Sequence, residues 1–150
     1  MMCIAFISLI LVGWELYTIR QEVQGAFDRS LRIASDDKQY LETVDLPIDE
    51  TTAFTVFKYF IAGNLSLNEN TLTALTDQKI RNIVIDDFQI LNVFTPTSIE
   101  ITNPLTGEIM RGSIDRPSIA VLAHVEVKVI FLPTSINIPI FAVSTDWLPI

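Results

Sequence analysis

The sequence predicts an α+β fold: a long N-terminal helix that is first apolar and then amphipathic, a second short helix, and a C-terminal antiparallel β-sheet. Three observations support this prediction. Residues 1–14 carry no charge, an apolar stripe with helical spacing continues beyond them, and the apolar period changes to two from about residue 80. Runs of helix followed by runs of strands are typical of an α+β fold.

The first predicted helix begins with the apolar segment 1–14, MMCIAFISLILVGW. At about 1.5 Å per residue this segment is roughly 21 Å long, against a hydrocarbon core of about 30 Å. Trp14 and Tyr17 match the aromatic belt of a helix that leaves a membrane. Because Arg20 is the first basic residue, a cleavable signal with a basic start is not indicated. We favour a short basic leader removed ahead of the helix over a plain membrane anchor.

The same helix continues as an amphipathic segment with one apolar stripe. The stripe comprises Leu16, Ile19, Val23, Ala26, Phe27, Leu31, Ala34 and Leu41. Nothing interrupts the pattern before Asp36-Asp37, and Pro47 prevents its continuation, so the helix has roughly forty residues, far above the usual ten to fourteen. We therefore expect two parts: residues 1–45, a helix for a membrane or a filament core, and residues 46–150, a globular α+β domain that folds without it.

A second helix is predicted over Asp49–Ala62. Asp49 is a suitable N-cap, and Gly63 occupies the predicted C-cap position. The aromatic and aliphatic side chains of this helix recur on one face, and we expect them to pack in the core against the stripe of the first helix. They are Phe54, Phe57 and Ile61, with Ala53, Val56 and Phe60 beside them.

Strands are predicted from Ile80 onward. The first reaches Phe94, with a bulge at Asp86-Asp87. The others are predicted at Ser98–Thr102, Glu108–Ile114, Ile119–Phe131 and Ile136–Thr145. Along Ile119–Phe131 the apolar side chains from Val121 to Phe131 alternate toward one face, and Pro139 marks the last strand as an edge or a bulge. The connections 116–117 and 133–135 are short enough for a meander.

Composition and motifs argue against several classes of function. The chain carries 10 Lys and Arg against 18 Asp and Glu, a net charge of −8, which disfavours nucleic-acid binding. One cysteine, Cys3, permits no internal disulfide and is expected as a small buried apolar residue; one histidine, His124, permits no histidine-based metal cluster. No nucleophile motif, phosphate loop or calcium loop is present. We therefore expect no enzyme activity, no cofactor and no metal, and we interpret His124 as a cross-strand structural residue.

Glu15 is the one acidic residue at the edge of the apolar segment. A carboxylate there is costly in lipid and is a functional hypothesis by default. Two interpretations stay open. Either Glu15 reaches the headgroups, or it pairs with a cation on a neighbouring copy, such as Arg20 or a freed α-amino group.

An apolar N-terminal helix that continues as an amphipathic stem into a small antiparallel sheet resembles the type IV pilin architecture. More narrowly, the chain resembles TadE-like pseudopilins, in which an apolar run ends in Gly-x-Glu. The residues that carry this resemblance are Val12-Gly13-Trp14-Glu15-Leu16, then Gln21, Val23, Ala26 and Ala34, and the stretch FKYFIAGNLSL at Phe57–Leu67. Type IV pilins usually carry glutamate at the fifth mature position, where this chain has Ala5.

The resemblance implies a structural subunit of an extracellular pilus-like filament at the cell surface, inserted in the cytoplasmic membrane before assembly. Its partners would be copies of itself, with no nucleic acid. The residues expected in the helical core of such an assembly are Ile4, Ile7, Leu11, Trp14, Glu15, Ile19 and Val23. Two alternatives stay open: a single-pass membrane-anchored binding module, and a minor pseudopilin of a secretion or pilus machine.

Overall fold

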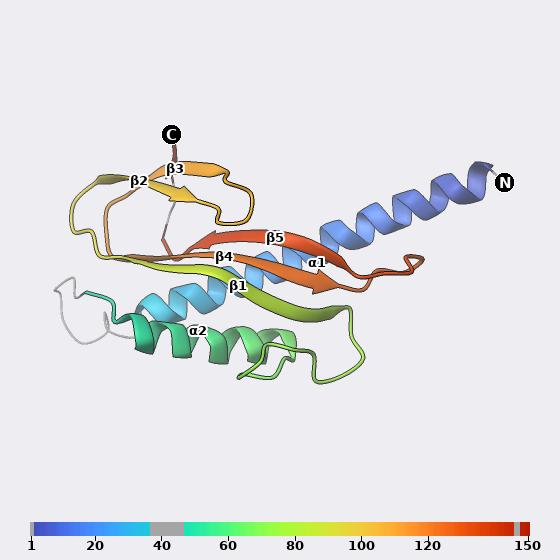
Figure 1. The fold of residues 1–150 in the computed structure, drawn as a ribbon, viewed down its shortest axis with the longest axis horizontal. Helices are drawn as coiled ribbons and strands as arrows, with labels where there is room; N and C mark the ends of the chain where they lie inside the picture. The colour runs from blue at the N-terminus through green and yellow to red at the C-terminus, as the bar shows by residue number, and fades with distance from the viewer. Residues whose placement is uncertain (1, 37–46, 146–147) are drawn as a thin grey trace.

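The computed structural model describes residues 2–36, 47–145 and 148–150. The elements within these residues are α1 (Met2–Asp36), α2 (Glu50–Leu65), β1 (Ile80–Leu91), β2 (Thr97–Thr102), β3 (Ile109–Ile114), β4 (Ser118–Val127), β5 (Ile136–Val143) and β6 (Leu148–Pro149). Two helices precede antiparallel strands, so the predicted α+β fold is confirmed. Figure 1 shows three layers: the helices, the sheet β1-β4-β5, and the smaller sheet β2-β3-β6.

α1 is one continuous helix of 35 residues, as the long amphipathic pattern predicts. Its second half contributes buried side chains to the main core, among them Val23, Phe27 and Leu31, each at most 1% exposed. Phe27 meets Phe57 of α2 edge to face, with ring centroids 5.5 Å apart. The main core therefore extends across the expected division at residue 45. The last residue of the predicted stripe, Leu41, lies outside the described residues.

α2 begins where predicted but ends later. Asp49 is the N-cap, because its Oδ2 accepts a hydrogen bond from the Thr52 N–H at 2.9 Å. The predicted C-cap at Gly63 is wrong: the helix continues to Leu65, and Ser66 is the cap, in the left-handed region at φ 55°. Leu65 and Leu67 are both buried, so one further turn places two apolar side chains in the core.

The main sheet has the order β1-β4-β5 and carries the long strands. The predicted bulge in β1 is confirmed, because Ile85 lies opposite Ala123 whereas Asp87 lies opposite Leu122, which leaves Asp86 as the extra residue. β5, which contains Pro139, is an edge strand as predicted.

Of the two connections predicted for a meander, 133–135 joins strands that pair, β4 and β5, whereas 116–117 joins β3 and β4, which lie in different sheets. β2 and β3 pair in a second sheet with β6, and β1 pairs with β4 instead of β2. The physical reason is the second face of β4, where Ala120 and Leu122 are also apolar and need a cover. The β2-β3 hairpin provides it, with Ile101 only 1% exposed in a second, smaller core.

Three strands end earlier than predicted, and of these β5 is the least shortened, because it stops at Val143 instead of Thr145. β1 stops at Leu91, which leaves Phe94 half-exposed at 50%. β4 stops at Val127, and although Val129 is still buried, Phe131 is not on the inward face as predicted. Phe131 is 66% exposed and has a left-handed backbone at φ 66°, which turns the chain toward β5.

Candidate functional site

The first part of α1 projects beyond the rest of the chain (Figure 1). From Cys3 to Leu11 every side chain is exposed except the half-buried Ser8, whose hydroxyl donates to the Ile4 carbonyl at 2.9 Å. We call residues 2–14 the free half of α1. Its large apolar side chains are exposed by between 48% (Leu11) and 71% (Ile4), except Val12, which is half-buried and packs against the main core. An apolar surface of this kind, on all sides of a helix, is stable in lipid or against other protein surfaces.

The structure divides the seven predicted assembly residues into two groups with one residue between them. The exposed group lies on the free half: Ile4, Ile7, Leu11 and Trp14. Ile19 and Val23 are 3% and 1% exposed and lie in the chain's own core, so their surfaces are already covered. Glu15 lies where the two groups meet. Cys3, expected to be buried, is exposed on the free half.

Glu15 is held by two other segments of the same chain. One carboxylate oxygen, Oε1, lies 2.8 Å from Nζ of Lys79, at the start of β1. We describe this contact as an ion pair. The other oxygen, Oε2, accepts a hydrogen bond from the Ile130 N–H at 3.2 Å. Neither interpretation of Glu15 from sequence named Lys79.

The surroundings of Glu15 favour its ionised form. The Lys79 ammonium lowers the pKa of the Glu15 carboxyl below its ordinary value, and the Ile130 N–H acts in the same direction, whereas burial opposes them. The Glu15 side chain is 11% exposed and that of Lys79 is 64% exposed, so water reaches the pair mainly from the lysine side. The carboxylate therefore attaches the start of the packed half of α1 to the globular part.

A hollow of about 440 Å³ lies beside this ion pair. Its walls come from the helix, from Lys79 and from the β4–β5 connection: Leu11, Trp14, Glu15, Thr18, Ile19, Glu22, Lys79, Ile130 and Phe131. The exposed walls are mainly apolar, because Ile130 is 58% and Phe131 is 66% exposed. A hollow that combines an ion pair with apolar walls is suited to contact with an amphipathic surface.

Sequence reasoning missed Lys79, Ile130 and Phe131. Lys79 precedes a strand and has no motif, so only the fold brings it to Glu15. For the other two residues a signal was present: the run Val129–Pro133 is apolar where the chain must turn, and turns are normally polar. We instead expected the run to continue the buried face of β4.

His124 is the cross-strand residue that the sequence predicts. Its Nδ1 lies 2.9 Å from both carboxylate oxygens of Asp86, the bulged residue of β1. Their side chains are 27% and 11% exposed. No group of three or more His, Cys, Asp or Glu side chains that could hold a metal ion is found among the described residues.

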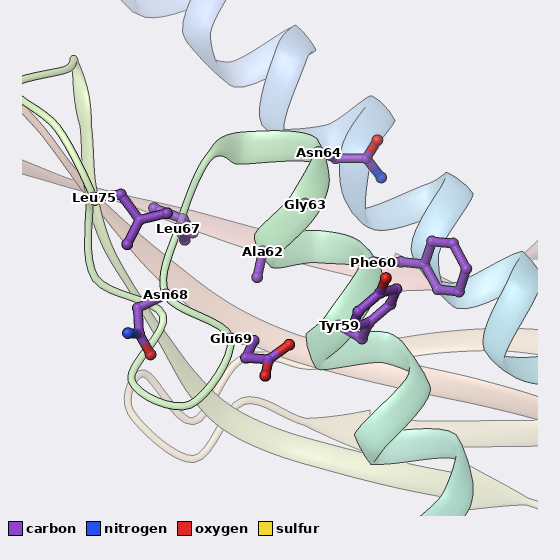
Figure 2. A pocket seen from close by; sticks show the side chains of 9 residues that line it. All are labelled: Tyr59, Phe60, Ala62, Gly63, Asn64, Leu67, Asn68, Glu69 and Leu75. Atoms are coloured by element: carbon purple, nitrogen blue, oxygen red, sulfur yellow. The ribbon is translucent and has the colours of Figure 1, made fainter.

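A second hollow, of about 430 Å³, lies between the end of α2 and the loop that follows it (Figure 2). Figure 2 shows the apolar residues that line it: Tyr59, Phe60, Ala62, Leu67 and Leu75. Glu69 is its one ionisable carboxylate. This lining contains no paired acid and base.

α1 is also the one helix in the described part of the chain that is long and apolar enough to cross a membrane, between Cys3 and Ser35. Only 6% of its most apolar window is buried, unlike the core helix of a soluble protein. The helix is therefore compatible with a membrane anchor or a signal sequence. In comparisons with known proteins, no family model, no curated protein and no solved structure matches this chain.

Proposed function

We propose that this chain is a structural subunit of an extracellular pilus-like filament. In this proposal the free half of α1 is inserted in the cytoplasmic membrane first and then packs against the same helix of other copies in the filament core. The globular part stays outside the core and makes lateral contacts. The TadE-like and pilin-like resemblance of residues 12–16 and 57–67 is part of the basis for this proposal.

The free half of α1 is the observation that carries the proposal. Most of its side chains are exposed, including Ile4, Ile7 and Trp14 at 71%, 56% and 70%. Transfer of such surface out of water contributes roughly 25 cal/mol per Å². Lipid covers this apolar surface before assembly, and neighbouring helices cover it afterwards.

The pairing of Glu15 also supports a buried position for the helix. A lone carboxylate at the edge of a helix bundle would be costly, whereas this one already has Lys79 at 2.8 Å. Residues 2–14 carry no charged side chain. The segment proposed for the core therefore brings no uncompensated charge into it.

Electron microscopy of material sheared from producing cells, with mass spectrometry of the fibres, tests the proposal. We expect filaments made of this chain, and we expect Ile7→Arg to abolish them because a charge enters the helical core. Ile109→Arg is the matched control: Ile109 has a similar exposure, 49% against 56%, but lies on β3. Ile109→Arg should still assemble.

Two outcomes would contradict a filament subunit. Normal filaments from Ile7→Arg would exclude a core built from the free half of α1. A wild-type chain that stays in the membrane fraction without fibres would favour the alternative, a membrane-anchored binding module or a minor pseudopilin.

A further inference from the structure

We infer that the β4–β5 connection is a second membrane contact, which enters the lipid headgroup region beside α1 while the chain is membrane-inserted. This inference rests on the membrane stage of the proposed function. The partner is a bilayer surface that contains anionic lipid. The residues involved are Leu11, Trp14 and Tyr17 on α1, Ile130 and Phe131 in the connection, and the adjacent Lys79 and Lys128.

The position of the connection is the first argument. Figure 1 shows the β4–β5 connection at the end of the main sheet from which the free half of α1 projects. The Ile130 N–H donates to Glu15 at 3.2 Å, so the connection touches the helix at the base of its free half. Phe131 and Leu11 line the same hollow. The exposed apolar surface of the helix therefore continues onto the connection.

The chemistry of the connection is the second argument. Ile130 and Phe131 are 58% and 66% exposed in a turn, where polar residues are usual. The left-handed backbone of Phe131, at φ 66°, occurs in a residue for which this conformation is uncommon. The Phe131 ring therefore stays in contact with water at a turn whose backbone conformation is uncommon for phenylalanine. Insertion of both side chains at a headgroup–acyl boundary would remove this apolar surface from water.

The third argument is that aromatic and basic side chains lie around Glu15, at the base of the free half of α1. Trp14 and Tyr17, exposed at 70% and 58%, have ring centroids 6.2 Å apart, and such amphipathic rings favour the membrane interface. The Lys128 N–H donates to the Lys79 carbonyl at 2.7 Å, so these two exposed lysines are neighbours. Anionic headgroups attract such lysines, although Glu15 and Glu22 lie nearby and limit the attraction.

The test places an environment-sensitive fluorophore at single cysteines of the full chain. Cys3→Ser removes the native thiol, and Phe131→Cys or Phe94→Cys provides the labelling site. Phe94 is the matched control, because it is also an exposed phenylalanine but follows the end of β1 in the sequence. Figure 1 shows that β1 ends on the side of the sheet away from the free half of α1. The probe is vesicles of phosphatidylcholine with phosphatidylglycerol, and flotation measures binding separately.

We expect both labelled chains to float with the vesicles. The label at residue 131 should rise several-fold in emission and be quenched by lipids that are spin-labelled near the headgroup, while the label at residue 94 stays unchanged. In vesicles without phosphatidylglycerol we expect a smaller emission change at residue 131, because the two lysines lose their anionic partners. An equal change with and without phosphatidylglycerol would exclude a contribution of these lysines to the contact.

Three outcomes would overturn the inference in distinguishable ways. Chains that do not float would refute the membrane stage of the proposed function, and the inference with it. Flotation with equal, small responses at residues 131 and 94 would refute the second contact alone. A response at residue 131 on self-association without vesicles would assign the connection to contacts between copies instead.

Discussion

The two halves of α1 belong to one continuous helix but have opposite surroundings. Residues 2–14 are exposed on almost every side, whereas the stripe from Ile19 to Ala34 is buried against α2 and the main sheet. Composition accounts for the difference, because the second half has a polar face for water and the first half has none. The chain thus buries one face of the second half internally and leaves most of the first half exposed.

Glu15 marks the boundary between these halves. The residue is the first side chain of α1 that bonds to the globular part, through Lys79 and the Ile130 N–H. A helix that projects from a domain needs such a fixed point if its direction is to be defined. One helix can thus pack in the core with its second half and present an exposed apolar surface with its first half. A short polar junction at Glu15 separates the two.

Deletions that separate the two halves should give the largest effect. A chain from Val12 onward loses only exposed side chains and the half-buried Ser8 among the described residues, so it should unfold cooperatively near the wild-type Tm. A chain from residue 46 onward also loses Val23, Phe27 and Leu31 from the core and should show no cooperative transition. Thermal unfolding by circular dichroism distinguishes the two. Cooperative unfolding of residues 46–150 would instead support the predicted division into two parts at residue 45.

Truncation of single side chains should give an intermediate effect. Phe27→Ala removes a fully buried ring and should lower the free energy of unfolding by about 3–5 kcal/mol. Ile7→Ala, on the free half, should change it by less than about 0.5 kcal/mol. Urea unfolding in mild detergent measures both. Similar losses for the two variants would mean that the free half contributes to the folded domain.

Removal of the charge at the junction should give a smaller effect than loss of the Phe27 ring, and one that depends on pH. Glu15→Gln keeps an acceptor for Ile130 but loses the ion pair, and since Lys79 is 64% exposed the loss should not exceed about 1 kcal/mol. The pKa of Glu15 is lowered in the folded chain, so its contribution is present above the ordinary value of 4.5 and is lost as the pH falls through the folded value. The Tm difference between wild type and Glu15→Gln should therefore disappear in acid. Exposed Glu22→Gln is the control, and a difference that persists in acid would contradict the ion-pair account.

Local patterns in the sequence were sufficient for most of the fold. The uncharged segment, the stripe, the Asp49 cap and the β1 bulge depend on residues close together in the chain, and the structure confirms them. The end of α2 was not predicted, because Gly63 is a good local stop and only the burial of Leu65 and Leu67 favours a further turn. The separate β2-β3-β6 sheet was not predicted either, since short connections do not reveal which strand pairs with which.

Sequence patterns were enough to indicate that α1 is long, that its first half is apolar on all sides, and that its second half packs along one stripe. The tertiary fold is needed to bring Glu15 to Lys79, 64 positions later, and to place Ile130 and Phe131 exposed beside the helix. The difference comes from how far apart along the chain the interacting residues are. Helix periodicity and capping act over a few residues, whereas ion pairs and surface patches depend on how distant segments are brought together by the core.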